Sequence, residues 1–104
     1  MELVKEIYTV TKKFPAEEKF EMTMQIRKAV TSILANLAEG FSRRTPADKS
    51  HKYTIARGEC SEVLAFLLIS VELRYISKED AVASIALAEQ TGKLLSGLIH
   101  THFE

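Results

Sequence analysis

Basic side chains gather in the middle of the chain, and their type suits the binding of phosphate groups. Residues 23–58 carry seven of them: Arg27, Lys28, Arg43, Arg44, Lys49, Lys52 and Arg57. Only Glu39 and Asp48 oppose them in this segment, which leaves a local net charge of +5. If the segment folds as two antiparallel helices, the cations meet at one end and form a surface that attracts RNA. Phe41, His51 and Tyr53 lie among them and are candidates to stack on unpaired bases.

The remainder of the chain offsets this charge. The whole sequence has 14 Lys and Arg against 14 Asp and Glu, so its net charge is zero. Residues 1–22 have a net charge of −1 and residues 59–104 have one of −4. This balance excludes a uniformly basic nucleic-acid-binding protein and an acidic tail protein. It also leaves open that the basic segment is an ordinary solvated helix end, whose arginines pair with Glu39, Asp48 or a neighbouring subunit.

A stripe of polar and small residues accompanies the basic segment at helical spacing. Its members are Gln25, Ala29, Ser32, Asn36, and Glu39 or Gly40. Asn and Ser disfavour helix interiors, and an anion near a helix C-terminus opposes the dipole, so Glu39 needs a cationic partner. The candidate partners are Arg27, Arg43 and Arg57. The stripe is either an Asn–Glu–Arg constellation for chemistry or a polar network at a helix or subunit seam, and we favour the network.

The sequence lacks the patterns that catalysis and metal binding require. His100 and His102 are two residues apart, so they point to different sides of a helix and cannot chelate one metal. Cys60 is the single cysteine, which excludes an internal disulfide and a cysteine-cluster site and is typical of a small buried hydrophobe. Ser61 and Ser70 match no nucleophile pattern, and there is no Gly-rich phosphate loop. We therefore expect no enzyme, no metal and no cofactor.

The elements that position these residues have a helical period throughout. Apolar residues recur every three or four positions, which predicts helices over residues 2–13, 23–39, 46–75 and 78–101. Thr23 is the expected N-cap of the second helix, and Gly40 its expected C-cap with positive φ. Thr45-Pro46-Ala47-Asp48 and Ser77-Lys78-Glu79-Asp80 are typical of helix starts. The prediction is all-α: an antiparallel up-down-up-down four-helix bundle forming a single domain over residues 1–104.

The third helix indicates self-association, because residues 63–73 are apolar nearly all round and need cover on more than one side. Another copy of the chain is the simplest partner, so we expect a homo-oligomer. The longest apolar stretch, Val63–Val71, is interrupted only by Ser70 and is far shorter than the roughly 20 residues of a membrane span. The first residues also lack the basic start and apolar run of a signal peptide. We therefore expect no membrane partner and a cytoplasmic location.

Several motifs resemble a known family. They are Phe14-Pro15-Ala16-Glu17-Glu18, the block from Met22 to Ala29, the block from Ser32 to Gly40, and Ile55-Ala56-Arg57-Gly58-Glu59-Cys60-Ser61-Glu62-Val63. Together they resemble the bacterial four-helix-bundle proteins encoded by intervening sequences within 23S rRNA genes. Two departures stand out: the family usually has Gly-Leu where this chain has Glu21-Met22, and commonly Gly-Ser where it has Gly58-Glu59.

The resemblance implies an all-helical bundle that assembles as a pentameric ring, with no established enzymatic activity. Such proteins are also similar in fold to the accessory variability proteins of diversity-generating retroelements, which bind RNA and a reverse transcriptase through a basic surface. The positions that match the family are Gln25, Arg27, Ser32, Asn36, Glu39, Gly40, Arg43, Ala56 and Glu62, and the roles implied for them are structural or interfacial. Our hypothesis is a non-enzymatic homo-oligomer, with a pentamer favoured, that binds RNA. The alternative is a protein–protein adaptor or scaffold ring without nucleic-acid binding.

Overall fold

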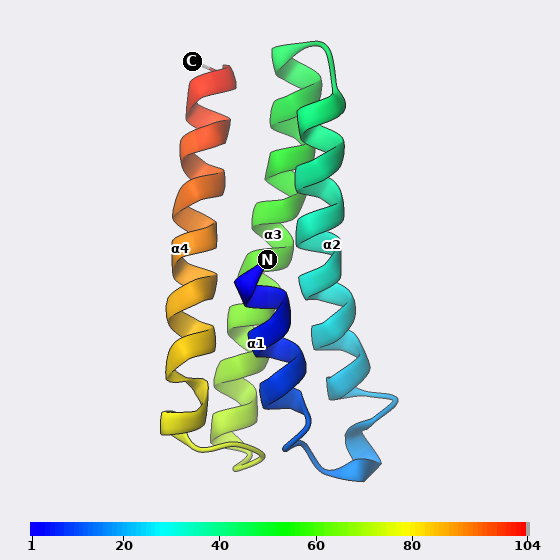
Figure 1. Cartoon of the computed structure of the whole chain (residues 1–104), viewed down its shortest axis with the longest axis vertical. Coiled ribbons are helices and arrows are strands. Elements are labelled where there is room, and N and C mark those ends of the chain that lie inside the picture. Colours follow the sequence, from blue (N-terminus) through cyan, green and yellow to red (C-terminus); the bar gives the residue numbers. More distant parts are fainter. Residues whose placement is uncertain (104) are drawn as a thin grey trace.

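Helices account for nearly all of the structure, a computed structural model that describes the backbone of residues 1–103 and the side chains up to Thr101. The four α-helices are α1 (Glu2–Thr11), α2 (Met22–Ser42), α3 (Pro46–Glu72) and α4 (Lys78–Phe103), and a 3₁₀ turn, η1 (Ala16–Glu18), follows α1. The described residues contain no strand. Successive helices run in alternating directions (Figure 1). The predicted all-α bundle is therefore confirmed.

The two predicted helix starts are confirmed by their capping bonds. At the start of α3 the Asp48 N–H donates to Thr45 Oγ1 at 3.1 Å, and Pro46 stands in the first turn. Before α4 the pairing is reciprocal, because the Asp80 N–H donates to Ser77 Oγ and the Ser77 N–H donates to Asp80 Oδ2. Both motifs act within a few residues, which is why local spacing was enough to predict them.

The helix ends differ from the prediction in three places. Thr23 lies buried inside α2 rather than capping it; the N-cap is Glu21, without a side-chain cap bond. Gly40 is helical and no glycine has positive φ, since α2 continues to Ser42. The third helix stops at Glu72 instead of continuing to Tyr75. Arg74 takes a left-handed conformation with φ 63°, and the Tyr75 N–H donates to Ser70 O at 2.9 Å, which closes a Schellman cap.

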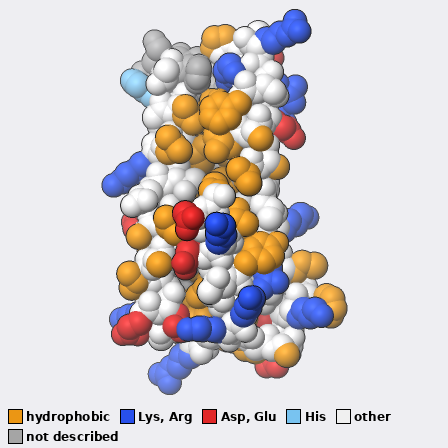
Figure 2. Space-filling view, viewed as in Figure 1, with side chains coloured by type: hydrophobic (Ala, Val, Ile, Leu, Met, Phe, Trp, Pro, Cys, Tyr) orange, Lys and Arg blue, Asp and Glu red, His pale blue; other side chains and the backbone are white. Residues whose placement is uncertain are grey.

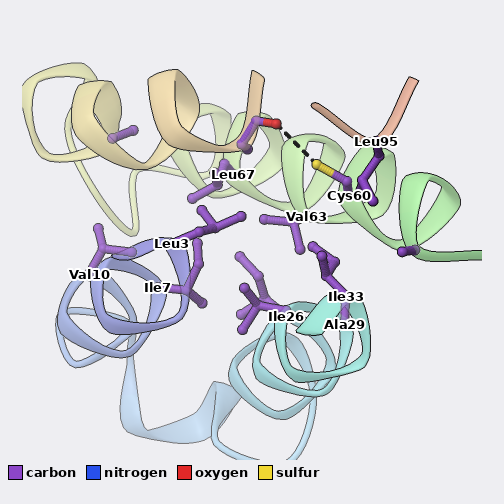
Figure 3. Packing of buried hydrophobic residues seen from close by; sticks show 14 of the residues in the cluster. Leu3, Ile7, Val10, Ile26, Ala29, Ile33, Cys60, Val63, Leu67 and Leu95 are labelled. Atoms are coloured by element: carbon purple, nitrogen blue, oxygen red, sulfur yellow. Dashed lines mark hydrogen bonds between the residues drawn. The ribbon is translucent and has the colours of Figure 1, made fainter. Parts of the chain in front are cut away.

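The core lies around α3, which packs along both α2 and α4. Figure 3 shows Ile26 and Ile33 of α2 and Leu3 and Ile7 of α1 facing the α3 side chains. All are buried, as are these residues of α3 and α4: Ala56, Cys60, Val63, Leu67, Ala88 and Leu95. Much of the apolar circumference of α3 is therefore covered within the chain.

The helix α1 is short and leaves part of the bundle uncovered. Its 10 residues pack against both α2 and α4, whereas α2 and α4 do not touch each other within the described residues. Figure 1 shows α1 covering only the lower half of the gap between them, and Figure 2 shows hydrophobic side chains on the same face above α1. The exposed large hydrophobics of α2, α3 and α4 are Met24, Leu34, Phe41, Leu68, Ile69, Val82 and Leu94. No helix among the described residues is long and apolar enough to cross a membrane.

Candidate nucleic-acid interface

The turn between α2 and α3 carries the strongest exposed positive charge among the predicted site residues. Arg43 and Arg44 form this turn and both are exposed. They stand between the end of α2 and the Thr45–Pro46 start of α3, at the top of Figure 1. Phe41 is 61% exposed beside them, and His51 is exposed on the first turns of α3. Two of the three aromatic side chains expected among the cations, Phe41 and His51, are therefore exposed at this end of the bundle.

Glu39 finds its main cationic partner on the neighbouring helix. Lys52 Nζ lies 2.7 Å from Glu39 Oε2, and Arg43 lies 3.8 Å from the same oxygen. The hydrogen bond and charge of Lys52, with a smaller contribution from Arg43, lower the pKa of Glu39. Arg43 was among the predicted partners, whereas Lys52 was not. Counting residues from the turn did not single it out, because Glu39 lies four residues before Arg43 and Lys52 eight residues after Arg44. The antiparallel packing of α2 and α3 brings the two side chains together.

The Lys49 ammonium group forms hydrogen bonds inside the protein. Its Nζ donates to Gly40 O at 3.2 Å and to Phe41 O at 2.9 Å. These carbonyls belong to the last turn of α2, where backbone acceptors have no partner inside the helix. Lys49 therefore contributes charge to the turn while its ammonium group caps α2.

Gly40 and Tyr53 are buried against each other below this turn. A Cβ on Gly40 would lie 2.4 Å from Tyr53 Cε1, which is inside van der Waals contact. The Tyr53 side chain has no exposed surface, so the expectation that it stacks on bases is wrong. Its ring instead meets the Phe41 ring edge-on, with 5.9 Å between centroids. Gly40 thus serves close helix packing, and Tyr53 supports Phe41 from beneath.

The other predicted cations do not join the turn. Arg27 lies near the opposite end of α2, where its Nε donates to Thr11 Oγ1 at 2.9 Å and its guanidinium stacks on Tyr8. Lys28 is exposed beside it, about 22 Å along the helix from Arg43 at 1.5 Å per residue. Arg57 faces α4 and donates to Ser96 Oγ at 3.5 Å. The seven basic residues therefore form three separate sets, and only four of them surround the turn.

The first part of the polar stripe, with Gln25, Ala29 and Ser32, lines an open groove between α2 and α3. On the α2 side the groove is lined by Gln25, Lys28, Ala29 and Ser32, and on the α3 side by Glu59 and Glu62. Asn36 donates to Ser32 O and Oγ within its own helix, so the bonds that the structure gives it do not cross between helices. Burial and the neighbouring Glu62 raise the pKa of Glu59. An Asn–Glu–Arg constellation is absent among the described side chains, because Asn36 bonds Ser32 and Glu39 bonds Lys52.

Cys60 is buried, as expected for a single cysteine that belongs to no disulfide or metal-binding pattern. Its Sγ donates to Ala88 O at 3.0 Å across the α3–α4 contact (Figure 3), and burial raises the pKa of the thiol. His51 is exposed and His102 lies outside the described side chains. Among the described residues no group of three or more His, Cys, Asp or Glu could hold a metal ion.

Comparison with known proteins decides the family. The model of the 23S rRNA-intervening sequence protein family matches residues 1–97. The chain belongs to this family. A solved structure from Bacteroides thetaiotaomicron, described as a protein with unknown function from the S23 ribosomal protein family, superposes with a TM-score of 0.86 at 30% identity. The match covers 94% of this chain and 92% of that one. No curated protein matches the chain.

The structure also places the two motif departures from the 23S rRNA-intervening sequence family. A Cβ on Gly58 would meet nothing within 4 Å, so this glycine is not required by a close contact. Glu59 borders the polar groove beside Glu62, where it adds a second carboxyl group. Glu21, the first residue of the other departure, is the N-cap residue of α2, and its side chain makes no capping hydrogen bond.

Proposed function

We propose that this protein is a non-enzymatic, self-associating helical bundle of the cytoplasm that binds RNA through the α2–α3 turn. The observation that carries the proposal is the state of charge at this turn. Glu39 is the carboxylate that pairs with Arg43, and Lys52 lies closer to the same oxygen, at 2.7 Å. Arg43 lies farther from Glu39, at 3.8 Å, and its side chain is about half exposed, whereas Arg44 forms no ion pair among the described residues. Two exposed guanidinium groups on successive residues suit the phosphates of a nucleic-acid backbone.

Self-association would multiply this modest site. Leu68 and Ile69 remain exposed on α3, at 60% and 43%, although most of that helix is covered within the chain. Exposed apolar residues grouped on one helix favour contact with a second copy. In the pentamer that the family resemblance implies, five turns would act on one RNA and raise the avidity without a strong single site. The family's link to 23S rRNA genes makes rRNA the first RNA to test.

The test is a fluorescence-anisotropy titration of a single-stranded RNA at several salt concentrations. We expect the double variant Arg43→Glu with Arg44→Glu to bind at least tenfold more weakly. We also expect the slope of log affinity against log salt to fall by about 1.4 for each copy that contacts the RNA, since each lost phosphate contact removes roughly 0.7 for single strands. A matched control is Lys12→Glu with Lys78→Glu, which makes the same change of charge at exposed positions away from the turn. If the wild-type protein retains no RNA at low salt, the proposal is wrong.

A second candidate function is a protein–protein adaptor, favoured by the uncovered face above α1. α2 and α4 make no contact there among the described residues, and Leu34 and Phe41 of α2 are exposed. An adaptor predicts that surface charge at the turn is unimportant. The two functions separate in the same titration, because an adaptor without RNA affinity responds to neither double variant.

A further inference from the structure

A second groove lies at the opposite end of α2 from the basic turn. It is formed by α1, the segment after η1 and the first turns of α2, and has a volume of about 560 Å³. Its lining includes Tyr8, Lys19, Phe20, Met24, Arg27 and Lys28. Figure 2 shows hydrophobic and basic side chains side by side over this lower part of α1 and α2. The size is in the range of about 300–1,000 Å³ for sites that take a small ligand.

The aromatic side chain of Phe20 is presented to solvent by an anchored segment. Phe20 is 74% exposed, the highest exposure among the large hydrophobic side chains that the structure describes. Two residues earlier, Glu18 accepts hydrogen bonds from the Tyr75 hydroxyl at 2.6 Å and from the Met22 N–H at 3.3 Å. Glu18 thus bonds both to the α3–α4 connection and to the start of α2. These two hydrogen bonds anchor the backbone segment that carries Phe20.

The cations around the groove have few partners in the chain. The guanidinium of Arg27 lies 4.5 Å from the Tyr8 ring centroid, and its bonds go to Thr11 Oγ1 and Tyr8 O rather than to a carboxylate. Lys19 Nζ lies 5.6 Å from the Phe20 ring centroid. Neither Arg27 nor Lys19 forms an ion pair among the described residues. Lys28 also borders the polar groove, where its charge acts on Glu59. No carboxylate lines the groove to balance Arg27 and Lys19, so its chemistry suits an anion joined to a flat apolar group.

We infer that the groove binds one unpaired base of a single-stranded RNA, stacked on Phe20, with the adjoining phosphates at Arg27 and Lys28. Aromatic platforms beside cations bind single strands in this way, because every base offers a π-face to the ring. The inference rests on the proposed RNA binding. It adds a stacking contact to a base, whereas the α2–α3 turn contacts the phosphates.

The surface of α2 between this groove and the α2–α3 turn, with Arg43 and Arg44, allows one RNA strand to reach both sites. Residues spaced three or four apart on α2 form an exposed stripe: Met24, Lys28, Thr31, Ala35, Ala38 and Ser42. The stripe contains no carboxylate that would repel a phosphate backbone. It ends next to Arg43, about 22 Å from Lys28.

The experiment compares two labelled single strands of about ten nucleotides with the same length and charge, one of adenosines and one of abasic spacers. We expect the wild-type protein to bind the adenosine strand about tenfold more tightly than the abasic strand. Phe20→Ala should remove most of this preference without changing the affinity for the abasic strand, and Phe20→Trp should restore it. Stacking on Phe41 at the turn accounts for the remainder. Leu94→Ala is the matched control, since Leu94 is also exposed but lies on α4.

The outcomes separate the two proposals. If the wild-type protein binds both strands equally, the groove does not read bases and only this inference fails. If it binds neither strand, RNA binding itself fails and the inference fails with it. A Leu/Glu peptide whose binding is lost in Phe20→Ala, while the base preference stays intact, would assign the groove to an acidic protein partner and overturn the inference. The double variant of Arg43 and Arg44 should weaken both strands alike and keep the preference.

Discussion

Gly40 of α2 and Tyr53 of α3 lie so close that a single methyl group between them would overlap the ring, 2.4 Å from Cε1. Both residues are buried, and Tyr53 in turn supports the exposed Phe41 ring. This contact holds α2 and α3 at short range just below the basic turn. It makes the position of Arg43 and Arg44 depend on a residue without a side chain.

Gly40→Ala is expected to destabilise the protein. Displacing a buried ring costs about 1–3 kcal/mol, which outweighs the gain of up to roughly 1 kcal/mol from the better helix propensity of Ala. Urea denaturation followed by circular dichroism measures the difference. Gly97→Ala in α4 is the control, because a Cβ there meets nothing within 4 Å, and it should stabilise by about 0.5–1 kcal/mol. Equal effects of both substitutions would contradict the assigned role of Gly40.

Arg74→Gly is expected to stabilise the protein. Arg74 occupies the left-handed position of the α3 cap with φ 63°, which costs a residue with a Cβ roughly 1 kcal/mol relative to glycine. Thermal unfolding should show a higher midpoint for the glycine variant. Arg74→Ala, which keeps the Cβ, is the control and should bring little change. A glycine variant less stable than the alanine variant would mean that the Arg74 side chain itself contributes more than the strain.

Glu59→Gln is expected to stabilise the protein at neutral pH. Burial and Glu62 raise the pKa of Glu59 in the folded state. Such a carboxyl favours folding below its unfolded pKa, and this contribution is lost as the pH rises through the folded pKa. Removing the repulsion between the two carboxylates should bring about 0.5 kcal/mol. The measurement is urea denaturation at pH 4 and pH 7, where the gain should appear only at the higher pH.

The control for this prediction is Glu89→Gln on α4, at an exposed position. It should leave the free energy of unfolding unchanged at both pH values. If Glu59→Gln destabilises at pH 7, the ionised Glu59 has a favourable partner, and the repulsion by Glu62 is not the dominant effect.

Leu68→Glu combined with Ile69→Glu is expected to dissociate the oligomer that we propose. The two side chains are exposed on α3, so the change should leave the helical circular dichroism spectrum intact while charging the contact. Light scattering should then give the mass of one chain, 11.7 kDa. A wild-type protein that already has this mass at micromolar concentration would show that the exposed side chains of α3 do not mediate self-association.

Local signals in the sequence determined the helices. The Thr45–Asp48 and Ser77–Asp80 motifs predicted the starts of α3 and α4, because a capping bond joins groups only three residues apart. The apolar period predicted the buried faces for the same reason, since one helix turn sets the spacing. Burial of Cys60 and the family itself could also be predicted from residue types along the chain.

Only the tertiary structure decided the partners. Lys52 neutralises Glu39 because α3 folds back along α2, whereas Arg27 turns to Tyr8 because α1 ends beside it. The basic residues that are close in sequence consequently separate into sets at two ends of the bundle and at the α3–α4 contact. Gly40 looked like a helix end because glycine is common there, and the ring of Tyr53 gave the actual reason. Sequence spacing fixes neighbours within a helix, but contacts between helices depend on where each one starts, stops and packs.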